Sequence, residues 1–488
     1  MTLTGETHAP RRNGGDPRAG VAELFAITDA ARRGPSAAAT AALHARGRLT
    51  VRERLALLFD DGTFREIDLL RRHRGGGPHD GRPHPDGVVT GWGRAGGRKV
   101  FAYADDFRIY GGQLGEAYAG KIHKVMDLAL AAGAPLVSLH DGAGARVQEG
   151  VGALAGYGGI IRRCARACGV IPQVSVVLGP CVGAAACLPA LADFVFLAPG
   201  TAQPNLTAQP NLTAQPSLTG AGVAHAGGEE TEPVVPGGER ECIAGVRALL
   251  SMLPPNCHSR PPSVAVDDLD DPPGRANDRL LDLVPADSDL AYDVRPVIEE
   301  IVDGGQFLQV QAGWAGNVVC GLARLAGQVV GIVASQPAVL AGALDADAAS
   351  KAARFVRTCD AFNIPLVTLV DVPGFRPAPS QEQGAMIRHA ATLACAYGAA
   401  TVPRVQLILR RAHGAAYVVM DSRALGADLS FAWPTNEIGA GREVVHSYHA
   451  AERGLVDDVI DPARTRAVLV DALDALRGKF ARIPEPMR

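Results

Sequence analysis

The sequence has little net charge and very few lysines. Its 488 residues include 48 Lys and Arg against 51 Asp and Glu, and only five of the basic residues are lysines. Proteins that bind nucleic acids in general have a strong basic excess, so this balance predicts no nucleic-acid partner. We interpret the scarcity of lysine as a coding bias rather than a functional signal.

The chain also lacks the cysteine and leader patterns of several protein classes. None of its nine cysteines forms a Cys-x-x-Cys pair, and Cys164 and Cys168 have no His or Cys pair nearby. This pattern predicts no metal site and favours reduced thiols. Charges occur throughout residues 5–18, where a signal peptide would need an apolar core. We therefore expect a cytoplasmic protein.

One uncharged stretch, residues 170–192, is long enough to cross a bilayer. It contains Pro172, Pro180, Pro189 and several glycines, which favour a strand, a tight turn and a buried helix over a membrane span. We expect no membrane partner. The 47% of hydrophobic residues can fill substantial cores, and the length fits two or three domains.

The most informative feature is a long internal repeat. Equivalent residues of the two copies are separated by nearly the same number of residues throughout the repeat. The pairs that lie 230 or 231 residues apart are Gly91 with Gly321, Lys121 with Lys351, Asp141 with Asp371, Pro172 with Pro403 and Gly183 with Gly414. Chance similarity would not keep one register over so many residues. The chain is therefore expected to be two copies of one α/β domain.

Each copy contains the same series of expected elements. Two β-branched runs around a polar turn predict hairpins over 88–106 and 318–336. An amphipathic helix, a buried strand and a loop are expected within 121–146 and again within 351–376. We place the first domain at 41–253 and the second at 291–488.

The remaining segments are expected to be less regular. Residues 1–40 are expected to be a flexible tail, followed by a helix from about Ala37 to Phe59, and the Pro- and Asp-rich residues 254–290 an extended linker. A hexapeptide (TAQPNL, TAQPNL, TAQPSL) repeats over 201–218. Its prolines disfavour a central strand, so we expect a lengthened surface loop.

In both copies an apolar strand runs into a turn of small residues at a helix start. Free N–H groups at such a turn suit a developing oxyanion, and small residues allow a ligand close to the backbone. Gly183-Ala184 and Ala415-Ala416 are therefore candidate oxyanion holes. Ordinary tight packing of strand on helix is the alternative explanation.

A second candidate is the loop Gly142-Ala143-Gly144-Ala145-Arg146, which could shape a pocket for a nucleotide-like ligand. It has neither the Walker A Lys-Ser/Thr nor the spacing G-x-G-x-x-G. We find no compact Ser/His/Asp or Cys/His arrangement. Chemistry carried by backbone donors would not need one.

Taken together, the sequence resembles the carboxyltransferase subunit of biotin-dependent acyl-CoA carboxylases, close to the propionyl-CoA carboxylase β type. The resemblance runs from about Gly47 to about Asp474. The segments that carry it are GGQLG at 111–115, GAGARVQEGVGALAGYG at 142–158, GPCVGAA at 179–185, KAARFVRTCDAFNIPLVTLVDVPGF at 351–375 and AWPTNEI at 432–438.

The resemblance implies two duplicated crotonase-like domains of β-β-α spiral units and a homo-oligomer, a hexamer in the family's arrangement. Acyl-CoA would bind the first repeat, at the loop 142–146, and carboxybiotin the second. Gly183 and Ala184 would stabilise the thioester enolate, and Ala415 and Ala416 would hold the ureido oxygen of biotin. Gly414 and Tyr417 would line the biotin side. The enolate would then capture the CO2 that carboxybiotin releases.

The resemblance also implies partners and differences. No Ala-Met-Lys-Met segment accepts biotin here, so biotin would come on a separate biotin carboxylase or biotin carboxyl carrier subunit, and no metal is expected. Family members usually have Gly-Gly in the first hole, Gly-Ala in the second, and a longer run after Ile438. Val418 stands where propionyl-type enzymes tend to have Asp, which implies a different acyl preference.

Two rival functions stay open at this point. One is a biotin-independent decarboxylase, or another enolate enzyme acting on acyl-CoA or acyl-carrier substrates. The other is a non-catalytic paralogue that stabilises a carboxylase assembly.

Overall fold

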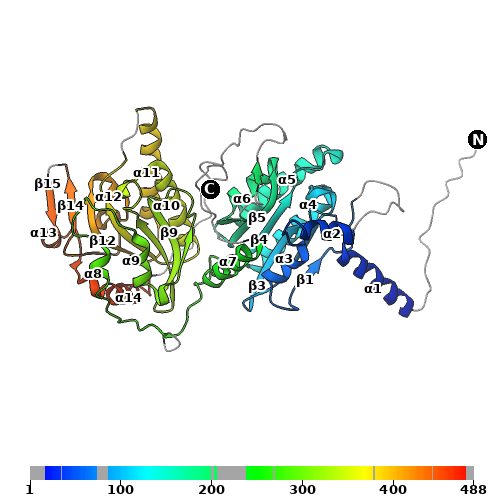
Figure 1. The fold of residues 1–488 in the computed structure, drawn as a ribbon, viewed down its shortest axis with the longest axis horizontal. Helices are drawn as coiled ribbons and strands as arrows, with labels where there is room; N and C mark the ends of the chain where they lie inside the picture. Colours follow the sequence, from blue (N-terminus) through cyan, green and yellow to red (C-terminus); the bar gives the residue numbers. More distant parts are fainter. Residues whose placement is uncertain are drawn as a thin grey trace, which may run out of the picture.

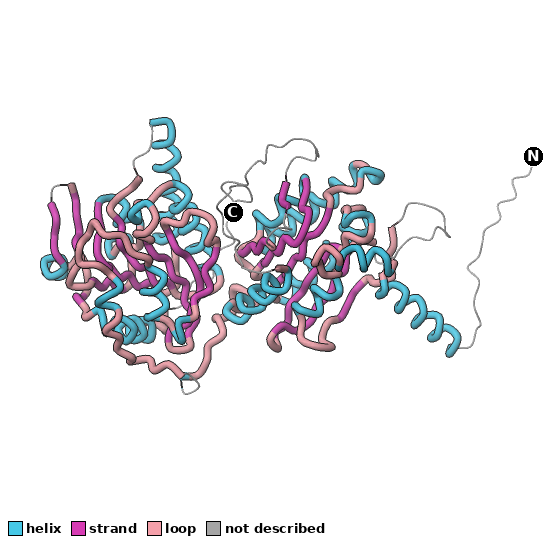
Figure 2. The backbone as a smooth tube through the Cα atoms, viewed as in Figure 1, coloured by secondary structure: helices cyan, strands magenta, loops and turns pink. Residues whose placement is uncertain are grey.

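The computed structural model describes residues 17–34, 36–73, 86–198, 203–205, 238–266, 270–376, 380–441 and 443–479. These residues form two lobes side by side along the longest axis (Figure 1). In each lobe helices flank one β-sheet (Figure 2). The first sheet has the order β1-β2-β3-β4-β5-β6, with β7 beside β5. The second has the order β15-β14-β12-β11-β10-β9-β8, with β13 on β12 and β16 on β13.

The first lobe is built from residues before the linker. Its strands are β1 (Arg65–Ile67), β2 (Val88–Ala95), β3 (Arg98–Asp105), β4 (Leu136–Gly142), β5 (Gln173–Val182), β6 (Phe194–Leu197) and β7 (Gln203–Asn205). Its main helices are α3 (Val51–Leu58), α4 (Glu116–Ala132), α5 (Val151–Ala167), α6 (Cys187–Leu191) and α7 (Glu239–Met252).

The second lobe repeats this plan. Its strands are β8 (Phe307–Val310), β9 (Val318–Leu325), β10 (Gln328–Ser335), β11 (Leu366–Val372), β12 (Arg404–His413), β13 (Leu429–Ala432), β14 (Glu437–Ala440), β15 (Glu443–His446) and β16 (Asp458–Val459). Its main helices are α9 (Val294–Ile301), α10 (Ala346–Ala361), α11 (Ser380–Ala399), α12 (Gly414–Val419), α13 (Ser447–Glu452) and α14 (Thr465–Ala475).

The strand registers confirm the duplication. Phe101 on β3 pairs in parallel with Leu136 on β4, and Gly331 on β10 pairs in the same way with Leu366 on β11. Both copies also have an irregularity in the next pairing, at Asp141 in β4 and at Asp371 in β11. Since register and bulge repeat together, the two copies share their detailed geometry as well as their topology.

The two lobes share one apolar core. The largest cluster of buried side chains includes Val176 and Val246 of the first lobe together with Val333 and Phe355 of the second. Each lobe adds a cluster of its own, around Val125 and Ile160 in the first. The lobes therefore bury apolar surface against each other, and this burial favours a fixed arrangement.

The segment after α7 contacts equivalent helix ends in both copies. The side-chain amide of Asn256 donates to the Gly133 carbonyl at 2.8 Å, just after α4. The amide of Asn363, which follows α10, donates to the Cys257 and Ser259 carbonyls at 2.7 and 3.0 Å. Gly133 and Asn363 both have positive φ, of 57° and 55°. The start of the linker is thus tied to both repeats.

The N-terminal segment differs from the expected flexible tail. Residues Pro17–Arg33 form helix α1. The helix expected over 37–59 is two helices, α2 (Ala37–His44) and α3. The break follows from Thr50, whose hydroxyl caps α3 while Glu53 bonds back to the Thr50 N–H at 2.7 Å.

The structure also refines two other expectations, for the linker and for the hexapeptide repeat. The linker contains the short helix α8 (Leu280–Leu283). In the first hexapeptide, Gln203–Asn205 form β7, which pairs with the end of β5; the rest of the hexapeptide repeat lies outside the described residues. Within the described part of the chain, no helix combines the length and apolarity needed to cross a membrane.

Candidate active site

The first candidate hole lies where β5 ends. Val182 closes the strand, and Gly183–Ala186 form the 3-10 turn η3 that leads into α6. Gly183 has a φ of 63°, and a side chain added there would meet no atom of the described residues within 4 Å. Glycine adopts this conformation without strain, and the first N–H groups of the turn have no partner inside it. The turn therefore presents backbone donors to open space.

The second lobe repeats this geometry at the end of β12. Gly414 opens α12, also with a φ of 63° and with open space where a side chain would be. The structural equivalents of Gly183 and Ala184 are thus Gly414 and Ala415, which are both exposed. The predicted pair Ala415-Ala416 begins one residue later. The Ala416 methyl group is buried in the core, while its N–H still belongs to the unpaired first turn of the helix.

The other two predicted residues of this site follow on α12. The Tyr417 side chain is only 9% exposed and packs into the core. Val418 is 44% exposed, on the solvent side of the same helix. Of these two residues, only Val418 has an accessible side chain.

A short additional strand flanks both turns. β7 pairs in parallel with the end of β5, with Asn205 opposite Val182. β14 pairs in parallel with the end of β12, with Gly439 opposite His413. The His413 ring lies so close to Gly439 that an added Cβ would be 2.7 Å from it. The sequence did not predict these strands, because the residues involved have no common pattern.

The structure brings the Gly-rich loop against the first hole. A Cβ at Gly144 would lie 2.9 Å from the Val182 carbonyl oxygen, next to Gly183. Hydrogen bonds hold the loop on the preceding turn, since Ala143 donates to Gly111 at 3.0 Å and Leu114 donates to Gly144 at 2.9 Å. The predicted acyl-CoA loop and the predicted enolate site are therefore neighbours.

Arg146 differs from the other loop residues because its side chain is bound to residues outside the loop. Its buried guanidinium donates to Asp86 at 3.1 Å, to Glu149 at 2.7 Å and to the Gln113 carbonyl at 3.0 Å. It also lies over the Tyr110 ring, 4.5 Å from the centroid. Since these partners occupy the guanidinium, Arg146 anchors the end of the loop rather than offering a free cation to a phosphate.

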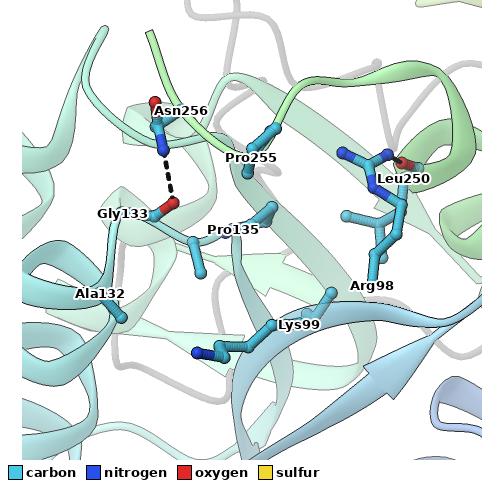
Figure 3. Close-up of a pocket in the computed structure, with 10 residues that line it drawn as sticks. Arg98, Lys99, Ala132, Gly133, Pro135, Leu250, Pro255 and Asn256 are labelled. Atoms are coloured by element: carbon cyan, nitrogen blue, oxygen red, sulfur yellow. Dashed lines mark hydrogen bonds between the residues drawn. The ribbon is translucent and has the colours of Figure 1, made fainter. Parts of the chain in front are cut away.

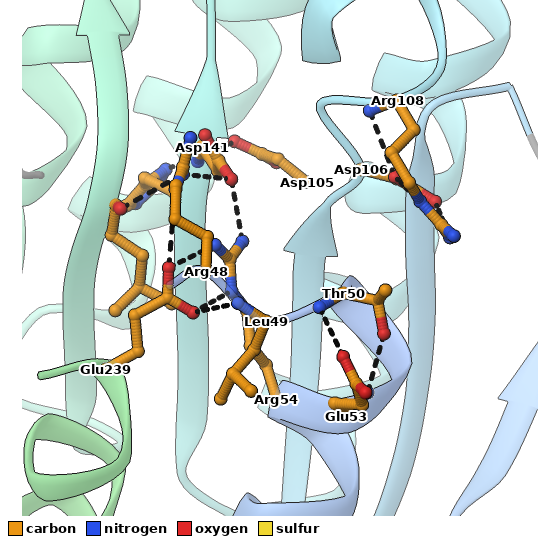
Figure 4. A network of polar contacts seen from close by, with 12 residues as sticks. Arg48, Leu49, Thr50, Glu53, Arg54, Asp105, Asp106, Arg108, Asp141 and Glu239 are labelled. Atoms are coloured by element: carbon orange, nitrogen blue, oxygen red, sulfur yellow. Dashed lines mark hydrogen bonds and ion pairs between the residues drawn. The ribbon is translucent and has the colours of Figure 1, made fainter. Parts of the chain in front are cut away.

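A buried cluster of charges lies beneath this loop (Figure 4). Arg48 and Arg54 donate to the Asp141 carboxylate at 2.6 and 2.8 Å. Arg54 also makes two hydrogen bonds to Glu239, at 2.8 and 2.6 Å. Two cations and two anions balance in this cluster, so burial of the charges is compensated. Sequence reasoning missed it, although the equivalent positions of Asp141 and Asp371 were a signal.

The equivalent aspartate of the second lobe is held by nearer residues. Asp371 accepts hydrogen bonds from Arg410 at 3.0 Å and from Arg411 at 2.8 Å, both on β12. Arg411 also donates to the Ala341 carbonyl at 2.8 Å. The end of β12 is thereby fixed two residues before the second turn.

A surface cavity lies away from both candidate holes. It has a volume of about 290 Å³ and is lined by residues that include Arg98, Lys99, Pro135 and Asn256 (Figure 3). These residues lie at the start of β3, just before β4 and in the linker, whereas both candidate holes follow strand ends. Among the described residues, no three His, Cys, Asp or Glu side chains cluster as a metal site would need.

Comparisons with known proteins agree on one family. Residues 42–441 match the carboxyl transferase domain family. The chain is 43% identical over 468 residues to the methylmalonyl-CoA decarboxylase subunit alpha of Veillonella parvula, covering 89% of this chain and 91% of the relative. It is 41% identical over 515 residues to the biotin-dependent acetyl-/propionyl-coenzyme A carboxylase beta5 subunit of Mycobacterium leprae, covering 95% and 93%.

A solved structure covers nearly the whole chain. It is the transcarboxylase 12S, described as a hexamer with methylmalonyl-coenzyme A and methylmalonic acid bound. The TM-score is 0.87 at 36% identity, over 97% of this chain and 98% of that one. The crotonase-like fold expected from the sequence is thereby confirmed, and the protein belongs to the carboxyl transferase family as a carboxyltransferase enzyme.

Proposed function

We propose that this protein moves a carboxyl group between carboxybiotin and the α-carbon of an acyl-CoA. The observation that carries the proposal is the pair of equivalent turns at Gly183 and Gly414, each with positive φ and open space above it. One turn adjoins the loop 142–146 and would take the acyl-CoA. The other, in the second lobe, would take biotin.

The first turn would stabilise the charge that develops on the substrate. Loss of the α-proton places negative charge on the thioester oxygen, and the N–H groups of Gly183 and Ala184 would face this oxygen. Preorganised donors of this kind contribute about 3–4 kcal/mol each to transition-state stability. The loop at Gly144 would position the thioester against the turn.

The second turn fits the oxygen of a cyclic urea. Gly414 and Ala415 are exposed and have small or no side chains, so a flat ring can approach their N–H groups closely. Carboxybiotin, when it is bound at this turn, would supply the carboxyl group for transfer. Here the N–H groups of Gly414 and Ala415, with that of Ala416 next in the same turn, would hold the ureido oxygen and orient the ring.

We further propose a hexamer that works with a separate biotin carboxylase or biotin carboxyl carrier subunit. The two turns lie in different lobes of one chain (Figure 1), so a complete site would combine the first repeat of one subunit with the second repeat of another. Exposed apolar side chains beside the first turn, Val147, Val151 and Leu154, support a subunit contact there. The nine free cysteines fit a reducing compartment such as the cytoplasm.

The direction of transfer has two candidates. The chain is about equally similar to a carboxylase subunit and to a decarboxylase subunit. We favour transfer to acyl-CoA, since both candidate turns are intact. Decarboxylation of a malonyl-type CoA is the second candidate, and it would need only the first turn if it proceeded without biotin.

The deciding experiment is a transfer assay with malonyl-type CoA substrates and free biotin. We expect slow carboxyl transfer to biotin in the wild type, and its loss in Ala415→Val, whose methyl groups would crowd the ureido oxygen. Ala415→Val should still bind acyl-CoA. Loss of CO2 from the substrate without any effect of biotin would favour the decarboxylase, and binding without turnover would favour a non-catalytic assembly subunit.

A further inference from the structure

We propose that Asp105 is a positioning residue for the loop 142–146, and that its protonation state sets the affinity of this loop for acyl-CoA. The inference rests on the proposed function, because it assumes that the loop binds acyl-CoA. It adds a residue that has no place in the transfer chemistry itself.

Asp105 lies directly beneath the start of the loop. It is the last residue of β3, and its side chain points toward Asp141 (Figure 4). Its carboxyl group accepts hydrogen bonds from the Asp141 N–H, at 3.0 Å, and from the Tyr118 hydroxyl. A Cβ at Gly142 would be 3.3 Å from the same carboxyl oxygen. The peptide group directly before the loop, at the end of β4, is therefore hydrogen-bonded to Asp105.

Among the residues that the structure describes, no arginine or lysine donates to Asp105. The charge of Arg54 acts on it, but Arg54 is hydrogen-bonded to Asp141 and Glu239. The titratable groups that face Asp105 from the packed elements are Tyr103 on β3, Tyr118 on α4, His140 and Asp141 on β4, Tyr157 on α5, Cys181 on β5 and Arg54 on α3.

Burial raises the pKa of Asp105 to about 7; the Asp141 charge adds to this shift, while hydrogen bonds from Tyr118 and Asp141 oppose it. The neighbouring His140 does not titrate in the same range. Burial lowers its pKa to about 4, and its Nε2 lies 3.2 Å from the Ser175 hydroxyl. Asp105 is therefore the group of this network that changes charge near neutral pH.

The second repeat shows that the fold does not need this network. The positions equivalent to Asp105, Tyr118 and His140 are Ser335, Ala348 and Val370, all at a spacing of 230 residues. All three are buried in the same fold without a carboxyl group. A buried carboxyl group is costly, so its presence at this position of the first repeat, where the second repeat has Ser335, points to the ligand that the first repeat binds.

The ionised form should hold the loop more firmly. A carboxylate accepts the Asp141 N–H in a charge-assisted hydrogen bond, which is stronger than the bond to a neutral carboxyl group. Protonation below pH 7 would weaken this bond and loosen the residue from which the loop starts, Asp141. The affinity for acyl-CoA should then fall as the pH falls, while the rate of the bound complex stays unchanged, since Asp105 does not touch the reacting atoms.

The experiment compares propionyl-CoA binding and kinetics between pH 6 and pH 8.5. In the wild type we expect KM and Kd to rise about three- to tenfold toward pH 6, with kcat constant apart from effects common to all variants. Asp105→Asn should remove this pH dependence, and Tyr118→Phe should shift its midpoint to higher pH, because the ionised form loses a donor. Titration of the ligand itself is common to all proteins and cancels in the comparison.

Controls separate this inference from the proposed function. Ser335→Ala, at the equivalent position, should leave the pH profile unchanged. Amide hydrogen exchange of residues 141–147 without ligand should speed up below pH 7, after correction for intrinsic rates, in the wild type but not in Asp105→Asn. If the folded Asp105→Asn and Tyr118→Phe variants keep the wild-type pH profiles of binding and exchange, the inference is wrong. If the wild type binds no acyl-CoA, the proposed function fails and affinity control by Asp105 fails with it, while the exchange data still decide the positioning role.

Discussion

Arg410 is the second-repeat equivalent of Gly179, and each of these two residues allows a cation to reach the buried aspartate of its repeat. The guanidinium of Arg410 donates to Asp371 at 3.0 Å. Gly179 leaves room instead for Arg48 to reach Asp141, since an added Cβ would lie 2.4 Å from the Arg48 guanidinium and 2.1 Å from the Asp141 carboxylate. In the second copy the cation comes from the strand, whereas in the first copy Arg48 comes from the segment before α3 and Arg54 from α3 itself.

The crowding around Gly179 predicts that one methyl group added there strongly lowers the stability of the protein. Gly179→Ala should destabilise the protein by about 2–4 kcal/mol, because the methyl group displaces partners of a buried ion pair. Chemical denaturation measures the change. Gly158→Ala in α5 is the matched control, since its added Cβ meets no atom within 4 Å, and a helical alanine should be equal or slightly more stable. Equal stability of Gly179→Ala and the wild type would contradict the crowding described for Gly179.

The first turn can be tested without backbone strain. Gly183→Val should abolish turnover, but a β-branched residue is also strained at a φ of 63°. Ala184→Val avoids this strain and should lower kcat for carboxyl transfer by about 100-fold or more, since a bulky side chain keeps the thioester oxygen from the N–H donors. The exposed Ala131→Val on α4 should keep the wild-type rate. An unchanged rate in a folded Ala184→Val protein would remove this turn from the site.

Stability should depend on pH through buried carboxyl groups. Burial raises the pKa of Asp105 and of Asp421 to about 7, despite the Arg404 charge beside Asp421. An unfolded aspartate has a pKa of about 3.9, so between about pH 4 and 7 the folded state holds protons that the unfolded state has lost. The free energy of unfolding therefore decreases as the pH rises through this range.

His140 acts in the opposite sense below about pH 6.5, because its pKa is lowered to about 4 in the folded protein. We therefore compare the wild type with Asp105→Asn, in which only one group changes. The difference between their unfolding free energies should shift in favour of Asp105→Asn as the pH rises from 5 to 8. A constant difference would mean that Asp105 titrates in the folded protein as it does in the unfolded chain.

Assembly should depend on the apolar residues beside the first turn. Val151 is 83% exposed in the single chain, so Val151→Asp should shift the protein from a hexamer to smaller species in light scattering at micromolar concentration. Val266→Asp, at an exposed position in the linker, should leave the hexamer intact. A stable wild-type monomer would exclude a site shared between subunits.

Val418 should influence the choice of acyl chain. It is exposed on α12, beside the second turn. In the proposed hexamer it faces the acyl group bound by a neighbouring subunit, so Val418→Asp should change the ratio of kcat/KM between short and long acyl-CoA substrates by about tenfold. The expected direction is toward shorter chains, because a carboxylate is a poorer neighbour for methylene groups than a valine. Equal ratios in both proteins would assign the preference elsewhere.

Much of the fold and of the candidate site could be predicted from the sequence, because the signals for them are local. The spacing of about 230 residues predicted the duplication, and short patterns around Gly183 and Gly414 predicted both turns. A tight turn between strand and helix is specified by a few neighbouring residues, and its donors are backbone groups. The repeat spacing already pairs Gly414 with Gly183, but the predicted second hole, Ala415-Ala416, began one residue too late, and the positive φ of Gly414 shows where the turn starts.

The tertiary structure alone decided what supports these turns. Arg54 is 87 residues from Asp141 and 185 residues from Glu239 in the chain, and packing of α3 and α7 on the first lobe joins them. Asp105, Tyr118 and Asp141 meet only because β3 and β4 end, and α4 begins, on the same side of the first lobe. The backbone donors follow from the local sequence, whereas buried side-chain pairs depend on which distant segments the core brings into contact, and no local pattern encodes that.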